Sequence, residues 1–225
     1  MDILNRISIL LGPAAMARLR NSTVMVAGCG AVGSFAIEAL ARSGVGRIIV
    51  LDFDRIEESN INRQLFALHT TIGQPKVEVA AARIRDINPD IDVIALDTFF
   101  DASSDIPLRP DFVIDAIDTV ESKIALYKWC IKHDIAFISS MGAALKRDIS
   151  QIRRGSIYHT SVCPLAAKVR RIARGENLPD FPVVYSTEPP RVAALPGRAL
   201  GSIITVTGVF GLMLADGAIE YITTK

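Results

Sequence analysis

Apolar runs of strand length alternate, over the first 140 residues, with segments whose apolar positions recur at helical spacing. The strand-like runs lack apolar–polar alternation, which is typical of strands buried on both faces of a sheet. They predict strands over 23–27, 47–51, 91–96, 111–115 and 135–139. The spacing between them predicts helices over 31–43, 76–88 and 122–133, with Gly44 as a left-handed C-cap of the first. Strands separated by helices favour a parallel sheet covered on both faces.

The pattern changes in the second half of the chain. The link 97–110 is short and contains proline, so we expect a turn there in place of a crossover helix. After residue 151, short predicted strands over 152–157 and 183–185 flank a helix over 164–174. A proline-rich loop over 189–197 then leads to a final apolar helix. The predicted fold class is α/β: a Rossmann-like, doubly wound, mainly parallel sheet with antiparallel strands added in the C-terminal part. No linker separates the halves, so we predict a single domain over residues 1–225.

Composition adds few restrictions. Half of the residues are apolar and 22% are charged, as in an ordinary soluble globular protein. The net charge of +1 gives no overall attraction to nucleic acid, so an RNA-binding surface would be a local patch. The apolar stretch 203–215 is shorter than the roughly 20 residues that a membrane span needs, and Asp216 and Glu220 follow it. We therefore expect a core helix, no membrane association, and a cytoplasmic location, because the N-terminus also lacks a basic targeting region.

The three cysteines, Cys29, Cys130 and Cys163, are too scattered for a disulfide framework, and no CxxC pair suggests a zinc site. Cys163 precedes Pro164 at a predicted helix start, where a thiol pKa can be lowered. A buried, inert thiol is the favoured interpretation.

The first motif with chemical content is the glycine-rich turn Gly28-Cys29-Gly30-Ala31-Val32-Gly33, between the first strand and the first helix. Gly28 permits a tight bend, Gly30 lets the backbone approach a phosphate, and Gly33 lets the helix pack closely on the strand. The helix start then offers free N–H groups to an anion. Asp52 ends the second strand, where a carboxylate can accept both hydroxyls of a ribose. These features fit NAD, FAD or ATP equally well.

Further polar residues distinguish these ligands. Arg63 offers a planar fork for phosphate oxygens, Lys76 a point charge and Asn60 an uncharged donor, a set that suits a triphosphate better than a dinucleotide. Asp118 follows the fourth strand and is a candidate Mg²⁺ ligand, since a carboxylate facing a triphosphate needs a cation between them. The alternatives are isolated surface charges for Arg63 and Lys76, and a helix N-cap for Asp118.

These residues resemble the ubiquitin-activating-enzyme-like (ThiF/MoeB-like) superfamily of adenylating enzymes. The resemblance rests on the glycine turn and on the segments 51–54, 59–64, 72–76 and 115–118. In the second half, the segments 148–153, 163–170 and 185–188 look like those of the tRNA threonylcarbamoyladenosine dehydratases. The resemblance covers nearly the whole chain. It implies a nucleotide-binding half over 1–140, and a substrate-facing half with the C-terminal helix over 141–225.

The resemblance also implies ATP and Mg²⁺ as cofactors, with Asp52 on the ribose and Asp118 on the metal. The implied nucleotide-binding residues are Gly28, Gly30, Gly33, Asp52, Asp54, Asn60, Arg63, Gln64 and Lys76. The implied catalytic residues are Arg63, Lys76, Asp118 and Arg6. Arg6 enters only through an implied homodimer, in which it would reach the partner's triphosphate; from the sequence alone it is a terminal charge.

The implied reaction is ATP-dependent dehydration of N6-threonylcarbamoyladenosine in tRNA through a carboxyl-adenylate, which needs no enzyme cysteine. A second hypothesis is an adenylyltransferase for a ubiquitin-like sulfur carrier, with a sulfurtransferase or sulfur acceptor as partner. The cysteine-free loop 187–200 argues against it. A third hypothesis is an NAD-binding oxidoreductase or a non-catalytic nucleotide-binding module.

Basic residues provide a candidate tRNA surface. Lys168, Arg170, Arg171 and Arg174 share one predicted helix. Upstream of them lie Lys146, Arg147, Arg153 and Arg154. Contacts to phosphates would make binding depend on salt. A solvated helix face explains the helix group equally well.

Overall fold

The computed structural model describes residues 3–104, 106–191 and 200–225, and its centre is a seven-stranded sheet. The strands run in the order β3-β2-β1-β4-β5-β7-β6. All neighbours pair in parallel except β6, which is antiparallel to β7. The strands are β1 (Thr23–Ala27), β2 (Arg47–Asp52), β3 (Asp92–Asp97), β4 (Phe112–Asp115), β5 (Ala136–Ser140), β6 (Ile152–Ser156) and β7 (Pro182–Ser186). The α/β, mainly parallel fold class is thereby confirmed, with the antiparallel pairing in the C-terminal part.

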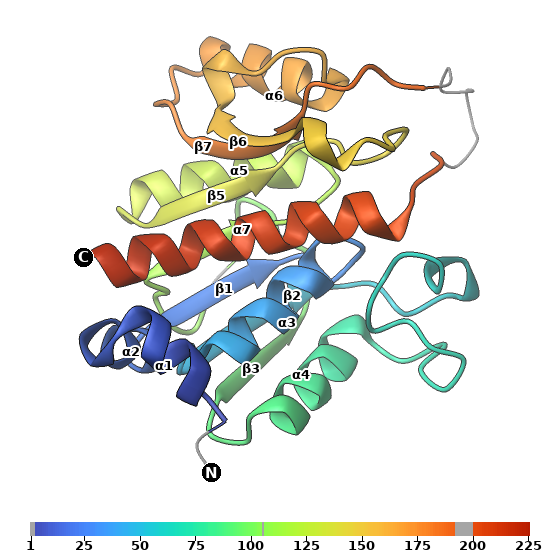
Figure 1. Cartoon of the computed structure of the whole chain (residues 1–225). Coiled ribbons are helices and arrows are strands. Elements are labelled where there is room, and N and C mark those ends of the chain that lie inside the picture. Colours follow the sequence, from blue (N-terminus) through green and yellow to red (C-terminus); the bar gives the residue numbers. More distant parts are fainter. Residues whose placement is uncertain (1–2, 105, 192–199) are drawn as a thin grey trace.

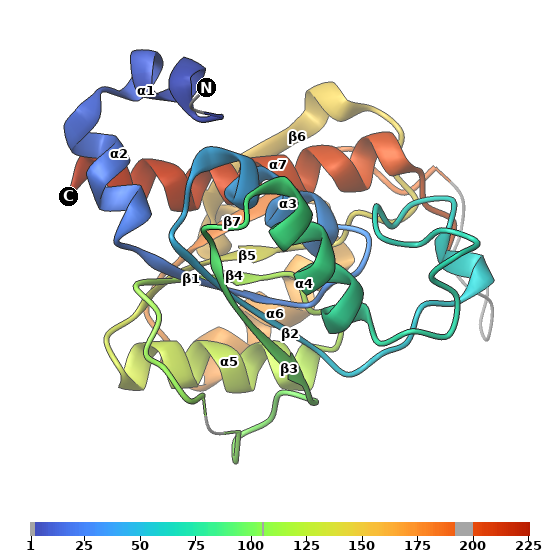
Figure 2. The ribbon, with the colours of Figure 1, turned by 90° about the horizontal axis from the view of Figure 1, so that it is seen from below.

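Helices cover both faces of the sheet (Figures 1 and 2). One layer contains α2 (Pro13–Arg20), α3 (Gly33–Ser43), α4 (Lys76–Ile87) and α7 (Ile204–Thr224). The opposite layer contains α5 (Val120–Lys132) and α6 (Pro164–Gly175). Each layer forms its own apolar core against the sheet. The buried strands are apolar on both sides for this reason, which is why their sequences lack alternation.

The strand order reverses between β1 and β4, which lie side by side with Ala27 opposite Asp115. In open α/β sheets, ligands bind at this switch point, outside the carboxyl ends of the strands. The helices α3 and α5 both begin at this edge, one in each layer (Figure 2).

Several details differ from the sequence-based expectations. The first crossover helix begins at Gly33, two residues later than predicted, and ends at the left-handed Gly44 as expected (φ 84°). The link between β3 and β4 contains no helix among its described residues, as expected. The N-terminal helices α1 (Asn5–Leu11) and α2, which meet at Gly12, were not predicted. Most of the predicted loop 189–197 lies outside the described residues.

Among the described residues, α7 is the one helix long and apolar enough to cross a membrane. Its side chains Phe210, Leu214 and Ala218 are buried in the core formed with α3 and the sheet. The prediction of a terminal core helix is therefore confirmed, although the helix extends to Thr224.

Candidate active site

A cavity of about 580 Å³ opens at the carboxyl ends of the central strands, within the size range of small-molecule sites. Its wall combines loops that follow β1, β2, β4 and β5 with the start of α5. Seven of the nine predicted nucleotide-binding residues line it: Gly28, Gly30, Asp52, Asp54, Arg63, Gln64 and Lys76. Asp118 lines it as well. Residues from five separate segments of the sequence thus converge on one site.

The glycine turn approaches the loop after β4 closely. Gly28 has φ 97°, and a Cβ atom there would lie 2.7 Å from the carbonyl oxygen of Ala116. A Cβ atom on Gly33 would lie 1.7 Å from the carbonyl oxygen of Gly28, so the predicted close packing of helix and strand is confirmed. Gly30 faces the cavity, and its Cβ atom would meet only the Gln64 side chain, at 3.7 Å.

These contacts predict a sharp contrast between two substitutions in one turn. Gly33→Ala is expected to destabilise the fold by about 3 kcal/mol or more, because backbone atoms must move to admit the methyl group. Gly30→Ala is expected to change stability by less than about 1 kcal/mol, since its methyl group enters open space. Urea denaturation measures both. Equal losses for the two variants would contradict this packing of the turn.

Asp52 is buried at the end of β2 and is tied to the glycine turn. One carboxylate oxygen accepts a hydrogen bond from the N–H of Cys29 (2.6 Å), and the other accepts one from the N–H of Asp54 (2.9 Å). Burial raises the pKa of Asp52, and the positive charge of Lys76 opposes this shift. Each carboxylate oxygen keeps a lone pair for a further donor, so Asp52 can still accept hydroxyl groups from a ligand.

Lys76 is nearly buried at the start of α4, and its Nζ lies 2.6 Å from a carboxylate oxygen of Asp54. The backbone N–H of Lys76 also donates to the Asp54 carbonyl oxygen (3.0 Å). The ammonium group has three donors, so two are available to other acceptors at the cavity. The salt bridge therefore orients Lys76 towards the cavity without consuming all of its donors.

Arg63 lies on the cavity wall, and its guanidinium donates to the carbonyl oxygen of Ser59 (2.7 Å) and to Asn62 Oδ1 (2.9 Å). Asn60 does not line the cavity. Its buried amide oxygen accepts from the N–H of Glu57 (3.1 Å) in a reciprocal capping box. Asn60 thus shapes the turn that carries Arg63, and its predicted contact with phosphate stays a prediction.

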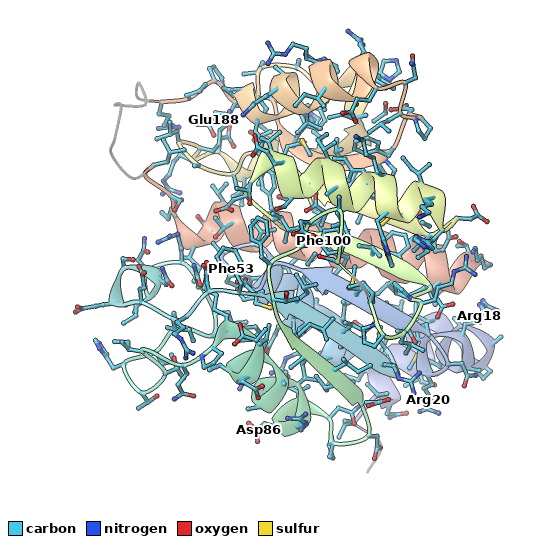
Figure 3. All side chains as sticks on the ribbon, turned by 180° about the vertical axis from the view of Figure 1, so that it is seen from behind. Arg18, Arg20, Phe53, Asp86, Phe100 and Glu188 are labelled. Carbon is cyan, nitrogen blue, oxygen red and sulfur yellow. The ribbon has the colours of Figure 1, made fainter. Side chains whose placement is uncertain are left out.

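Aromatic rings form an apolar wall on the Asp52 side of the cavity. Phe53, Phe99 and Phe100 all line it, and the rings of Phe53 and Phe99 meet edge to face with centroids 5.1 Å apart. Phe53 and Phe99 are 55% and 43% exposed. In Figure 3, Phe53 and Phe100 lie near the middle of the molecule, far from Arg18 and Arg20 on α2. Exposed ring faces of this kind suit a planar base.

Asp118 is exposed at the cavity, just before α5. The N-cap of α5 is Thr119, and no side chain caps the helix, so the alternative role of Asp118 as an N-cap is wrong. Among the described residues, no three His, Cys, Asp or Glu side chains cluster to hold a metal by themselves. Any metal bound at Asp118 would need most of its ligands from elsewhere.

Beneath the cavity lies a buried polar network that the sequence analysis missed. One carboxylate oxygen of Asp115 accepts from Lys123 Nζ (2.7 Å), Tyr127 Oη (2.8 Å) and Ser139 Oγ (2.6 Å). Asp115 and Lys123 are both fully buried. Burial raises the pKa of Tyr127, which keeps its hydroxyl protonated as a donor. The spacing of Lys123 and Tyr127 on one helix face was the available signal.

This network also fixes two loops of the cavity. The other carboxylate oxygen of Asp115 accepts from the N–H of Ile117 (3.1 Å), one residue before Asp118. Lys123 Nζ donates to the carbonyl oxygen of Ser140 (2.8 Å), at the end of β5. The position of Asp118 is therefore coupled to a buried ion pair.

A second missed element is a clasp around Glu188, in the loop after β7. Its carboxylate accepts from the N–H groups of Arg147 and Asp148 (both 2.8 Å) and from the side chain of Arg191 (2.8 Å). Lys146 is buried, and its ammonium donates to the Glu188 carbonyl oxygen. In Figure 3, Glu188 and the cavity residue Phe53 lie on the same side of the molecule. The clasp holds the loop that precedes β6.

The clasp predicts a pH dependence of stability. Arg191 and the two backbone N–H groups lower the pKa of Glu188 from 4.5 to about 2. Because the folded-state pKa is depressed, this contribution is present above pH 4.5 and is lost as pH falls towards 2. Glu188→Gln is expected to be less stable at neutral pH and to lose less stability over that acid range. Thermal denaturation at several pH values measures this, and parallel curves for both proteins would contradict it.

The remaining predicted residues lie away from the cavity. Arg6 is exposed on α1, and this helix lies near the C-terminal end of α7, away from the carboxyl ends of the strands (Figure 1). On α6, Lys168, Arg171 and Arg174 are exposed, whereas Arg170 donates to the carbonyl oxygen of Thr160 (2.8 Å).

One of the upstream cations is not free to bind RNA, which corrects the expectation for it: Lys146 is buried in the Glu188 clasp. Arg154 is exposed and pairs with Asp216 (3.4 Å) and Glu220 (2.7 Å) on α7, so its predicted role stays a prediction. The three cysteines are all buried, so the interpretation of Cys163 as a buried thiol is confirmed.

The sheet order, the glycine turn at the switch point and the carboxylate at the end of β2 together define a nucleotide-binding α/β protein. Comparison with known proteins refines this class. The ThiF family model matches residues 4–225. A tRNA threonylcarbamoyladenosine dehydratase of Bacillus subtilis (strain 168) is 47% identical over 194 residues, which cover 84% of this chain and 76% of that protein. The dehydratase of Haemophilus influenzae is 41% identical over 191 residues, covering 80% and 73%.

Solved structures agree with these relatives. The E. coli tRNA N6-threonylcarbamoyladenosine dehydratase in complex with ATP superposes with a TM-score of 0.91 at 33% identity, covering 98% of this chain and 93% of that one. This chain therefore belongs to the ThiF family, and within it to the family of tRNA threonylcarbamoyladenosine dehydratases.

Proposed function

We propose that this enzyme dehydrates N6-threonylcarbamoyladenosine in tRNA, using ATP and a carboxyl-adenylate intermediate. The observation that supports this most directly is the cavity itself. Its lining includes Arg63, Lys76 and Asp118 together with the glycine turn, in a chain 47% identical to the dehydratase of Bacillus subtilis. Hydride transfer does not need two cations and a carboxylate beside the turn. Attack on a triphosphate does need such groups, because they position the phosphates and neutralise their charge.

ATP binds along the wall from the Phe53 rings to the glycine turn. Asp52 accepts the ribose hydroxyls, and the adenine lies against Phe53 and Phe99. The phosphates lie on the free N–H groups at the start of α3, as anions do at helix N-termini. Arg63 and Lys76 neutralise the phosphates and hold the leaving pyrophosphate opposite the attacking oxygen at the α-phosphorus.

The reaction then proceeds in two steps. The carboxylate of the threonylcarbamoyl group attacks the α-phosphorus, and pyrophosphate leaves. A nitrogen of the same ureido group next attacks the activated acyl carbon, loses its proton and expels AMP, so that the ring closes with net loss of one water. No cysteine takes part, in keeping with the burial of all three thiols.

Mg²⁺ is the proposed metal, and Asp118 is the residue that would hold it. Mg²⁺ commonly takes one or two carboxylates and completes its shell with substrate phosphates and waters. The exposed Asp118 carboxylate fits that donor set, although it cannot form a metal site alone. When bound, the metal supplies charge neutralisation at the phosphates.

The enzyme is proposed to act as a homodimer in the cytoplasm. Ile9 and Leu10 on α1 are 77% and 81% exposed, beside Arg6, so an apolar surface is available where a second subunit would bring Arg6 to its neighbour's triphosphate. Sedimentation that showed only monomers would exclude this arrangement.

The exposed cations of α6 are proposed to contact tRNA phosphates. A sulfurtransferase or sulfur acceptor stays a predicted partner, without support from an exposed thiol.

The test is incubation of the protein with ATP, Mg²⁺ and tRNA that carries the threonylcarbamoyl group, followed by mass spectrometry of the nucleosides. The proposal requires a nucleoside lighter by one water, together with AMP and pyrophosphate. An unchanged nucleoside, with pyrophosphate released in response to a small carrier protein ending in Gly-Gly, would favour the adenylyltransferase hypothesis. Binding of NAD in preference to ATP would exclude both.

A further inference from the structure

One buried polar atom of a cavity-lining residue has no hydrogen-bond partner among the described residues. Among the side-chain N and O atoms of the described residues, Ser122 Oγ is buried without a hydrogen bond. Ser122 is 2% exposed and lines the cavity. Because native proteins satisfy nearly all buried polar groups, such an atom calls for an explanation.

Ser122 occupies the third position of α5, a helix of 13 residues. The helix begins without a side-chain cap, so its first N–H groups and the partial positive charge of the helix end stay available at this wall. The Ser122 hydroxyl adds a further donor to the same place. A helix N-terminus and a free hydroxyl together favour an anion.

The helix N-termini that contribute lining residues to the cavity include those of α3, after β1, and α5, after β4, on neighbouring strands. The proposed reaction joins two anions, a triphosphate and a carboxylate. The glycine turn leads into α3 and lines the cavity with Arg63 and Lys76, and these groups are assigned to the triphosphate. Asp118, one residue before the N-cap of α5, is the proposed Mg²⁺ ligand, and the Ser122 hydroxyl at the same helix end is the donor left for the other anion.

We infer that Ser122 Oγ donates a hydrogen bond to the carboxylate of the threonylcarbamoyl group and orients it, at the first turn of α5, for attack on the α-phosphorus. This inference rests on the proposed function. Ser122 is a positioning donor and not a nucleophile, because no described base lies within hydrogen-bonding distance of its oxygen. The substrate satisfies the atom that the protein leaves unpaired.

The test compares two buried serines. Ser122→Ala is expected to lower kcat/KM for the modified tRNA by about 10- to 100-fold, the effect of one hydrogen bond to a charged group. Its KM for ATP and its thermal stability should not change, because no hydrogen bond between described residues is lost. Ser22→Ala is the control: Ser22 Oγ donates to the Leu19 carbonyl oxygen (2.7 Å), away from the cavity. That variant should lose stability and keep its KM for tRNA.

The possible outcomes distinguish a failure of this inference from a failure of the proposed function on which it rests. A wild-type enzyme that dehydrates tRNA, alongside a Ser122→Ala variant with unaltered kcat/KM, would overturn the inference alone. The inference would also be overturned if Ser122→Ala lost thermal stability and raised the KM for ATP as much as the KM for tRNA, because a residue with a purely structural role gives that pattern. A wild-type protein that leaves the modified tRNA unchanged would overturn both.

Discussion

Replacing Lys123 with methionine is expected to lower the free energy of unfolding by about 3–5 kcal/mol. Lys123 and Asp115 form a fully buried ion pair (2.7 Å), and the substitution leaves the carboxylate of Asp115 in the interior without its cation. Removing one partner of such a pair costs far more than the pair contributes, because the other charge stays desolvated. Urea denaturation at neutral pH measures the loss.

Lys128→Met is the matched control on the same helix. Lys128 pairs with Glu176 (2.7 Å), but its side chain is 52% exposed. Surface pairs of this kind contribute about 1 kcal/mol or less, so this variant should remain close to the wild-type stability. Similar losses for both lysines would contradict the role given to the buried network.

Arg63→Ala is expected to reduce turnover by a factor of about 10² to 10³. The reason is the loss of one preorganised charge donor at the site where the transition state gathers negative charge. Single-turnover formation of AMP from ATP and modified tRNA measures the effect. The fold should persist, because the Arg63 side chain, among the described residues, donates hydrogen bonds to Ser59 and Asn62 of its own loop.

Arg55→Ala provides the comparison for Arg63. Arg55 lies a few residues earlier, is exposed and donates to the carbonyl oxygen of Gly73 (3.2 Å), outside the cavity lining. Its loss should leave turnover within about twofold of the wild type, since surface substitutions rarely disturb a site. A wild-type rate for Arg63→Ala would remove that residue from the catalytic group.

The nucleotide-binding half was predictable because its determinants are local. Unbroken apolar runs specify strands buried on both faces, and Gly44 ends a helix through a backbone angle that other residues avoid. The glycine turn and the strand-end Asp52 sit at fixed places in this topology, so the sequence order alone placed both at the cavity. Arg63 and Lys76 followed from their chemistry.

The rest depends on contacts between distant segments. The residue type of Asn60 suggests a phosphate-binding side chain, but its amide closes a turn of its own loop. Lys146 reads as a surface cation, yet it is buried against Glu188, 42 positions away. The unpaired state of Ser122 is defined only by what surrounds it in three dimensions. Such features have no periodicity, and a sequence pattern cannot reveal them.

The central claim is that the cavity binds the triphosphate of ATP, and a crystal structure with a non-hydrolysable ATP analogue tests this claim most directly. The expected result places the phosphates on the Gly28–Gly33 turn, within hydrogen-bonding distance of Arg63 and Lys76, with the ribose on Asp52. A triphosphate bound elsewhere, or one in the cavity that these side chains do not touch, would contradict the claim.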